Sequence, residues 1–251
     1  MHFEDVINFI LLAFTGCAAG FLNVSAGGGS LLTLPILIFL GLSPAVANGT
    51  NRIAILAQNI TAVARFNQLK AIPKEAILIT ALPALPGAII GAQLAVDIDE
   101  LLFQRILAII MAIIAGISFL KPPHLQGEKT IWLNGKNRMI LVPTFFCIGI
   151  YGGFIQGGVG FIIITALTMA GYDLVRTNAL KVLVVLIFTP LALAIFIANG
   201  QVDYAKGFIL SCGNATGAWI ASTIVVAKGH RFTRWIVLTA MTLFALKLLF
   251  V

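Results

Sequence analysis

Two basic residues lie within apolar stretches of the chain and are the strongest candidates for chemistry. Arg52 and Lys181 each follow a glycine-rich segment, and amides such as Asn48 and Asn178 stand close to them in the sequence. A guanidinium or an ammonium group held away from water binds an anion through charge-assisted hydrogen bonds. The pair therefore indicates an anion-binding function. The alternative is that each side chain extends to the nearer membrane interface, as long basic side chains near the end of a span do.

Two glycine-rich segments point to the same chemistry. Residues 27–30 read Gly-Gly-Gly-Ser and residues 157–160 read Gly-Gly-Val-Gly, and each interrupts an apolar stretch. A short helix that starts at such a break presents unpaired N–H groups and the positive end of its dipole, which together favour an anion. Small residues also let membrane helices pack closely, but a packing face needs glycine only at every third or fourth position.

We expect the substrate site to combine these helix starts with the nearby amide, hydroxyl and basic side chains. An anion held there needs no metal and no catalytic group. The candidate substrate-binding residues are Asn23, Ser25, Gly27, Gly28, Gly29, Ser30, Asn48, Thr50, Asn51, Arg52, Gln156, Gly157, Gly158, Gly160, Asn178 and Lys181.

The sequence offers little to a catalyst or a cation carrier. None of the 9 acidic residues falls at the centre of an apolar segment, and the three histidines (His2, His124 and His230) lie in polar ends or loops. Carriers of cations or protons normally keep a titratable group at membrane depth, and the chain has no GxxxxGK[ST] phosphate loop. We therefore expect no enzyme activity, no metal and no cofactor. No basic stretch is interleaved with aromatic residues, which argues against nucleic acid as a partner.

The composition places these residues in a membrane protein. Of the 251 residues, 60 % are apolar and 10 % are charged, whereas a soluble domain carries about 25 % charged residues. A soluble fold of this length could not cover its surface with so few charges. The lipid bilayer is therefore an expected partner, and the sequence leaves a homo-oligomer open.

Glycine breaks divide the chain into membrane elements. The stretch 6–51 has no charge and would be about 70 Å long as one helix, against roughly 30 Å of hydrocarbon core. We predict a helix over 6–22, a non-helical segment over 23–29 and a short helix over 30–40. The uncharged run 139–172 is broken in the same way. The other predicted spans are 45–66, 76–95, 102–120, 177–198, 207–227 and 233–250.

This order of a broken segment followed by three spans occurs twice, which predicts two homologous halves. We expect a first transmembrane repeat over 1–120, a cytoplasmic linker over 121–138 and a second repeat over 139–251. Basic loops alternate with acidic ones along the chain, and the positive-inside tendency then orients the halves oppositely if each broken segment is a re-entrant-type helical hairpin. The predicted fold is thus an all-α polytopic membrane protein with inverted repeats. Eight continuous spans in two parallel halves remain the alternative.

The motifs resemble those of a known family. Ala26-Gly-Gly-Gly-Ser30 with Pro35, followed by the run from Gly41 to Asn51, is similar to the first-half signature of the sulfite exporter TauE/SafE family. The segment from Gly152 to Gly160 and the later Thr177–Lys181 resemble its second-half signature. The resemblance implies a multi-pass transporter in the cytoplasmic membrane of a bacterium or archaeon that moves sulfur-containing anions such as sulfite or sulfonates. The second break lacks the hydroxyl that Ser30 gives the first.

The sequence therefore predicts a secondary transporter of a small anion, a sulfur oxyanion or organosulfonate, that works by alternating access. An anion channel built on the same glycine-rich hairpins is the alternative.

Overall fold

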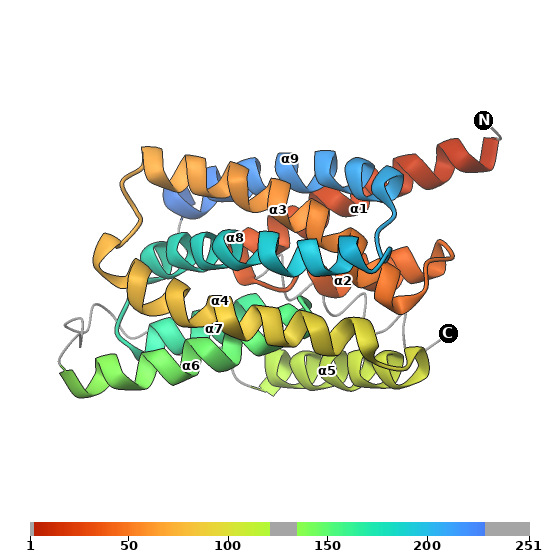
Figure 1. The fold of residues 1–251 in the computed structure, drawn as a ribbon. Helices are drawn as coiled ribbons and strands as arrows, with labels where there is room; N and C mark the ends of the chain where they lie inside the picture. Colours follow the sequence, from red (N-terminus) through yellow and green to blue (C-terminus); the bar gives the residue numbers. More distant parts are fainter. Residues whose placement is uncertain (1–2, 121–134, 229–251) are drawn as a thin grey trace.

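The computed structural model describes residues 3–120 and 135–228, and throughout these two ranges the regular structure is helical (Figure 1). Nine helices account for them. Their bounds are α1 Phe3–Ala26, α2 Ser30–Phe39, α3 Pro44–Gln68, α4 Lys74–Asp97, α5 Glu100–Leu120, α6 Gly135–Phe154, α7 Val159–Met169, α8 Leu174–Ala198 and α9 Tyr204–Lys228. Helix α6 starts inside the predicted linker, and the last predicted span, 233–250, lies outside the described residues.

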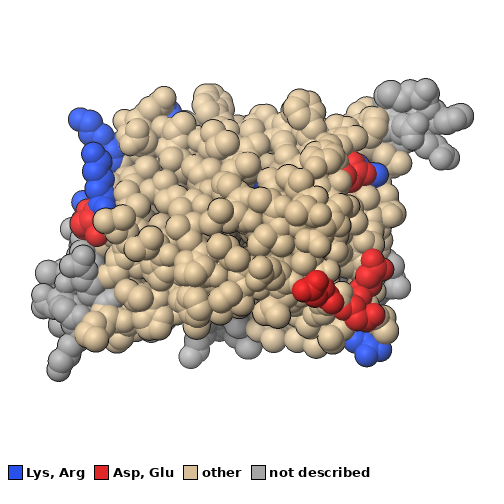
Figure 2. Space-filling view, viewed as in Figure 1, with Lys and Arg blue, Asp and Glu red and all other residues tan. Residues whose placement is uncertain are grey.

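Several helices and the surface of the molecule suit a bilayer. Three of those described are long and apolar enough to cross it, over Ile7–Ser25, Lys74–Asp97 and Leu174–Ala198. Figure 2 shows an almost uncharged band across the middle of this face, with charged residues at both ends, mainly basic at the left and mainly acidic at the right. Helix α4 joins the two ends. It begins at Lys74, just after Lys70, and ends at Asp97, just before Asp99 and Glu100. The all-helical membrane class is therefore confirmed.

The two halves of the described chain have matching elements. Helix α8 begins and ends 130 residues after α3, at both bounds. Backbone φ angles are positive at Gly41 and Gly171, and again at Lys70 and Gly200, so the helix ends also repeat with that spacing. In Figure 1, α1 and α3 run from right to left, whereas α6 and α8 run from left to right.

Each half packs a long helix against the other half. Helix α1 lies on α9, and α6 lies on α4. Glycines bring the backbones together, because a Cβ at Gly217 would stand 1.9 Å from the carbonyl oxygen of Cys17, and one at Gly91 would stand 2.0 Å from that of Ile150. Such small-residue contacts are how membrane helices associate closely. The two halves therefore form one interlocked unit.

The first helix break is shorter than the sequence predicted. Helix α1 continues through Asn23 and Ser25 to Ala26, so the predicted non-helical segment 23–29 is wrong over its first four residues. The chain turns at Gly27, whose φ of +89° suits glycine, and the N–H of Gly27 donates to Leu22 O at 3.0 Å. The break of the second half places Gly158 at φ +79° before α7. Gly27 touches Gly160 backbone to backbone, so the two breaks meet each other.

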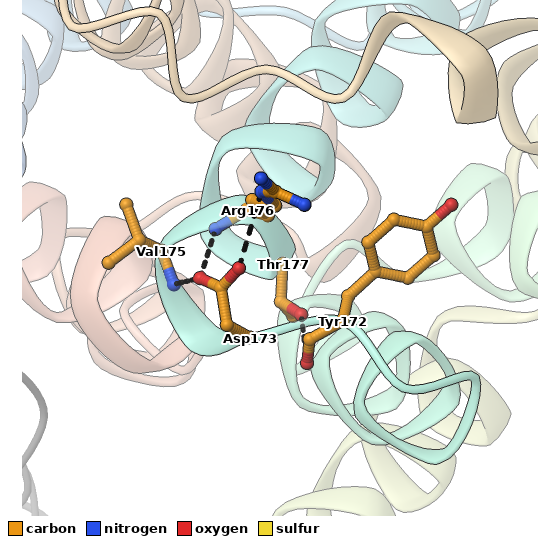
Figure 3. A network of polar contacts seen from close by, with 5 residues as sticks. All are labelled: Tyr172, Asp173, Val175, Arg176 and Thr177. Atoms are coloured by element: carbon orange, nitrogen blue, oxygen red, sulfur yellow. Dashed lines mark hydrogen bonds and ion pairs between the residues drawn. The ribbon is translucent and has the colours of Figure 1, made fainter. Parts of the chain in front are cut away.

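The start of α8 is fixed by a side-chain cap at the basic end. Asp173 accepts hydrogen bonds from the N–H groups of Val175 and Arg176, at 2.9 and 3.0 Å (Figure 3). The Arg176 guanidinium lies 3.4 Å from the other carboxylate oxygen. An aspartate in this position satisfies N–H groups that the helix leaves unpaired. This cap sets the point from which α8 runs inward to Lys181.

Candidate functional site

Lys181 lies on α8, is only 2 % exposed, and holds the end of α1. Its Nζ donates to the carbonyl oxygens of Asn23 and Val24, at 2.8 and 2.9 Å, and to Asn178 Oδ1 at 2.7 Å. These three acceptors use all three N–H groups of the ammonium. The carbonyls belong to the last turn of α1, where the helix dipole is negative and stabilises a cation.

Arg52 does the same for the end of α6. It is fully buried on α3, and its two terminal nitrogens donate to the carbonyl oxygens of Gly152 (3.1 Å) and Gly153. The guanidinium carbon lies 4.6 Å from the centre of the Phe196 ring, a cation–π contact. Each cation therefore caps a broken helix in the other half of the chain, and neither has a carboxylate partner among the described residues.

A small cavity lies where the two breaks meet. The space open to the centre of a water molecule is about 20 Å³, enough for roughly one water. Helices α1, α2, α3, α7 and α8 contribute its walls, together with the two breaks at Gly27 and Gln156. The lining residues are Asn23, Gly27, Ser30, Ile55, Gln58, Asn59, Gln156, Val159, Gly160, Lys181, Val182 and Val185.

A chain of amides forms one polar wall of the cavity. The N–H of Ser30 donates to Asn23 Oδ1 at 3.3 Å, Asn23 Nδ2 donates to Gln58 Oε1 at 3.0 Å, and Gln58 Nε2 donates to Asn59 Oδ1 at 3.3 Å. Because the backbone N–H can only donate, it fixes the direction of the whole chain. The chain ends at Asn59 Nδ2, a buried donor without a partner.

Gln156 provides the complementary group. Its Nε2 donates to Thr189 Oγ1 at 2.8 Å, and the Thr189 hydroxyl donates to Val185 O at 2.6 Å. Gln156 Oε1 is then a buried acceptor without a partner. The remaining side chains of the wall are aliphatic: Ile55, Val159, Val182 and Val185. The cavity thus combines one cation, one free donor, one free acceptor and an apolar surface.

The structure brings only some of the predicted site residues to this cavity. Asn23, Gly27, Ser30, Gln156, Gly160 and Lys181 line it. The other ten, which do not, are Ser25, Gly28, Gly29, Asn48, Thr50, Asn51, Arg52, Gly157, Gly158 and Asn178. Several of these have structural partners instead. The Ser25 hydroxyl donates to Phe21 O of its own helix at 2.6 Å, and Asn48 Nδ2 donates to Phe154 O at 2.8 Å.

Thr50 and Asn51 also serve the packing of the helices. Asn51 Oδ1 accepts from the Thr33 hydroxyl at 2.7 Å, which ties α3 to α2. Thr50 Oγ1 accepts from the N–H of Asp203 at 2.8 Å, just before α9. Partial burial opposes ionisation of Asp203, but the hydrogen bonds and charge of Lys206 outweigh it and hold the pKa of Asp203 below its usual value.

Sequence reasoning missed two polar residues of the cavity. These residues, Gln58 and Asn59, were not among the predicted site residues. The available signal was their position, because the two consecutive amides follow the apolar run 53–57 in the middle of a predicted span. The aliphatic lining residues carried no such signal, since they resemble the other buried aliphatic residues of α3, α7 and α8.

Comparisons with known proteins agree with this architecture. The model of the family described as "Sulfite exporter TauE/SafE" matches residues 12–248. A probable membrane transporter protein of Escherichia coli K12, YfcA, is 30 % identical over 245 residues, covering 96 % of this chain and 89 % of the relative. A probable membrane transporter protein of Haemophilus influenzae is 29 % identical over 231 residues, covering 89 % and 88 %. No solved structure gives a significant match.

The match extends from the first span to the last predicted one, and it confirms the resemblance carried by the two glycine-rich motifs. On this ground the chain belongs to the sulfite exporter TauE/SafE family.

Proposed function

We propose that this chain is a secondary transporter of a small anion, a sulfur oxyanion or organosulfonate, in the cytoplasmic membrane of a bacterium or archaeon. The observation that carries the proposal is the cavity between the two helix breaks, with Lys181 in its wall. A buried ammonium without a carboxylate partner attracts an anion. The family description and the transporter names of the relatives support transport in place of catalysis.

The small size of the cavity favours a carrier over a channel. A channel needs a continuous water-filled path, whereas this cavity has room for about one water. A sulfur oxyanion is larger than a water molecule, so the site must open before it can bind one. Opening to one side at a time is what alternating access requires.

We propose that the opening uses two inverted repeats, 1–120 and 139–251, joined by a cytoplasmic linker. The constant spacing of 130 residues between α3 and α8 supports this, as do the opposite directions of α1 and α6 in Figure 1. Each cation ties its own half to the broken helix of the other half. Movement of one half against the other would therefore strain and break these hydrogen bonds.

A counterflow experiment tests the transport proposal. Purified chain is reconstituted into liposomes that contain unlabelled sulfite, and radiolabelled sulfite is added outside. We expect label to accumulate inside above its equilibrium level for a time. A carrier that moves an unlabelled sulfite out can return with a labelled sulfite from outside. A channel would let the label equilibrate without overshoot. Uptake of label that is no faster than into liposomes without the protein would contradict transport of sulfite.

The role of Lys181 can be separated from that of Arg52. We expect Lys181→Gln to weaken sulfite binding roughly ten- to a hundredfold, because the charge in the cavity wall is lost. Arg52→Gln should lower thermal stability more than ligand affinity, because Arg52 caps α6 and does not line the cavity. Lys70→Gln, an exposed lysine at the basic end, is the matched control.

Isothermal titration and thermal unfolding of the purified variants supply both readouts. Wild-type affinity in Lys181→Gln would contradict the assignment of the cavity as the site. Equal loss of affinity in Lys181→Gln and Arg52→Gln would show that both cations hold the anion.

Cysteine labelling in intact cells tests the inverted arrangement. In a background without the three native cysteines, Leu42→Cys should react with a membrane-impermeant reagent, and Arg176→Cys should not, because α3 and α8 begin at opposite ends of the molecule (Figure 1). Asp99→Cys and Lys70→Cys serve as the outside and inside references. If positions 42 and 176 label from the same face, the halves are parallel.

A further inference from the structure

We propose that the cavity selects a singly charged oxyanion that keeps one proton, such as hydrogensulfite, over the corresponding dianion. The inference rests on the proposed function, because it assumes that the cavity is the anion site. Two independent features carry it: the number of charges around the cavity, and the mixture of free donor and free acceptor in its wall.

The charge around the cavity balances one negative charge. Lys181 is the one charged side chain among the described residues that line it. Arg52 on α3 is directed at the carbonyls of Gly152 and Gly153 and at the face of Phe196, and it does not reach the lining. A monoanion would neutralise Lys181. A dianion would bury a second charge against aliphatic side chains and unpaired amides, and an unpaired buried charge is strongly unfavourable.

The hydrogen-bonding groups fit a ligand that both donates and accepts. The amide chain that starts at the Ser30 N–H fixes Asn59 Nδ2 as a donor, while the Thr189 hydroxyl fixes Gln156 Oε1 as an acceptor. A fully deprotonated oxyanion has acceptors only, so it would leave Gln156 Oε1 unpaired or bring two negative groups together. An oxyanion with one O–H satisfies both amides, since its oxygens accept from Asn59 and its hydroxyl donates to Gln156.

The protein itself has few groups that could titrate at this place. Helices α1, α2 and α7 and the two breaks contribute amide, hydroxyl, glycine and valine to the lining, and α3 contributes Ile55, Gln58 and Asn59. Helix α8 contributes Lys181. A pH dependence seen with sulfite but not with a ligand that does not titrate therefore reports the ligand's own proton.

The test measures binding to the purified full chain by isothermal titration with three probes. Sulfite is titrated at pH values on both sides of its second pKa. Methanesulfonate is a monoanion with no proton to lose, and sulfate is a dianion of nearly the same shape. We expect the affinity for total sulfite to fall about tenfold per pH unit above that pKa, as the protonated form disappears. Methanesulfonate keeps its charge at each pH and so reports any pH dependence of the protein itself, against which the fall for sulfite is measured. Sulfate should bind more than about a hundredfold more weakly than methanesulfonate.

A pair of variants tests the role of the free acceptor. Gln156→Leu should reduce the preference for hydrogensulfite over methanesulfonate, because the partner of the ligand's O–H is gone. Gln93→Leu removes an exposed glutamine from α4 and is the matched control, so its binding should equal that of the wild type. A preference that survives in Gln156→Leu would overturn the role given to Oε1.

The measurements on the wild type test the selection of a monoanion without any variant. Sulfite affinity that is constant or rises with pH, or sulfate that binds as tightly as methanesulfonate, would overturn the selection of a monoanion while the anion site itself stands. Failure of all three probes to bind would overturn both this inference and the proposed function.

Discussion

The structure depends on how two cations are kept within an apolar bundle that offers them no carboxylate among the described residues. An ammonium or guanidinium taken from water loses several kcal/mol of hydration, which its surroundings must replace. Here the replacement comes from helix ends. Lys181 binds the last carbonyls of α1, and Arg52 binds those of α6. These carbonyls are available only because both helices end inside the bundle, α1 just before Gly27 and α6 three residues before Gly157. The breaks and the cations therefore require each other.

This mutual dependence also explains why the cavity lies between the two halves. Each cation bonds to carbonyl oxygens of the other half, and the backbones of Gly27 and Gly160 touch where the halves meet. The starts of α2 and α7, the amide chain from Asn23 to Asn59 and the ammonium of Lys181 are thereby gathered around one cavity. The two cations are not equivalent, however. Arg52 is covered by Phe196, whereas Lys181 borders the cavity and gives it its charge.

Much of this architecture could be predicted from the sequence, for identifiable reasons. An uncharged stretch that would form a helix longer than the bilayer thickness predicts a helix break, and consecutive glycines indicate its position. The predicted break nevertheless begins at Asn23, because Asn and Ser are common at helix ends. In the structure Asn23 bonds to Gln58 within the wall of the cavity, and Ser25 bonds back to its own helix, so both stay helical. The partners of Arg52 and Lys181 could not be predicted, because those carbonyls are 100 residues or more away in the chain and any residue type has a carbonyl.

The most direct test of the central claim is a structure determined with selenite bound, in which anomalous scattering locates selenium without ambiguity. Our account predicts one strong peak in the cavity, between Asn59 Nδ2 and the ammonium of Lys181, with Arg52 still bound to the carbonyls of Gly152 and Gly153. A peak beside the Arg52 guanidinium, or at the basic end of the helices with the cavity empty, would contradict it.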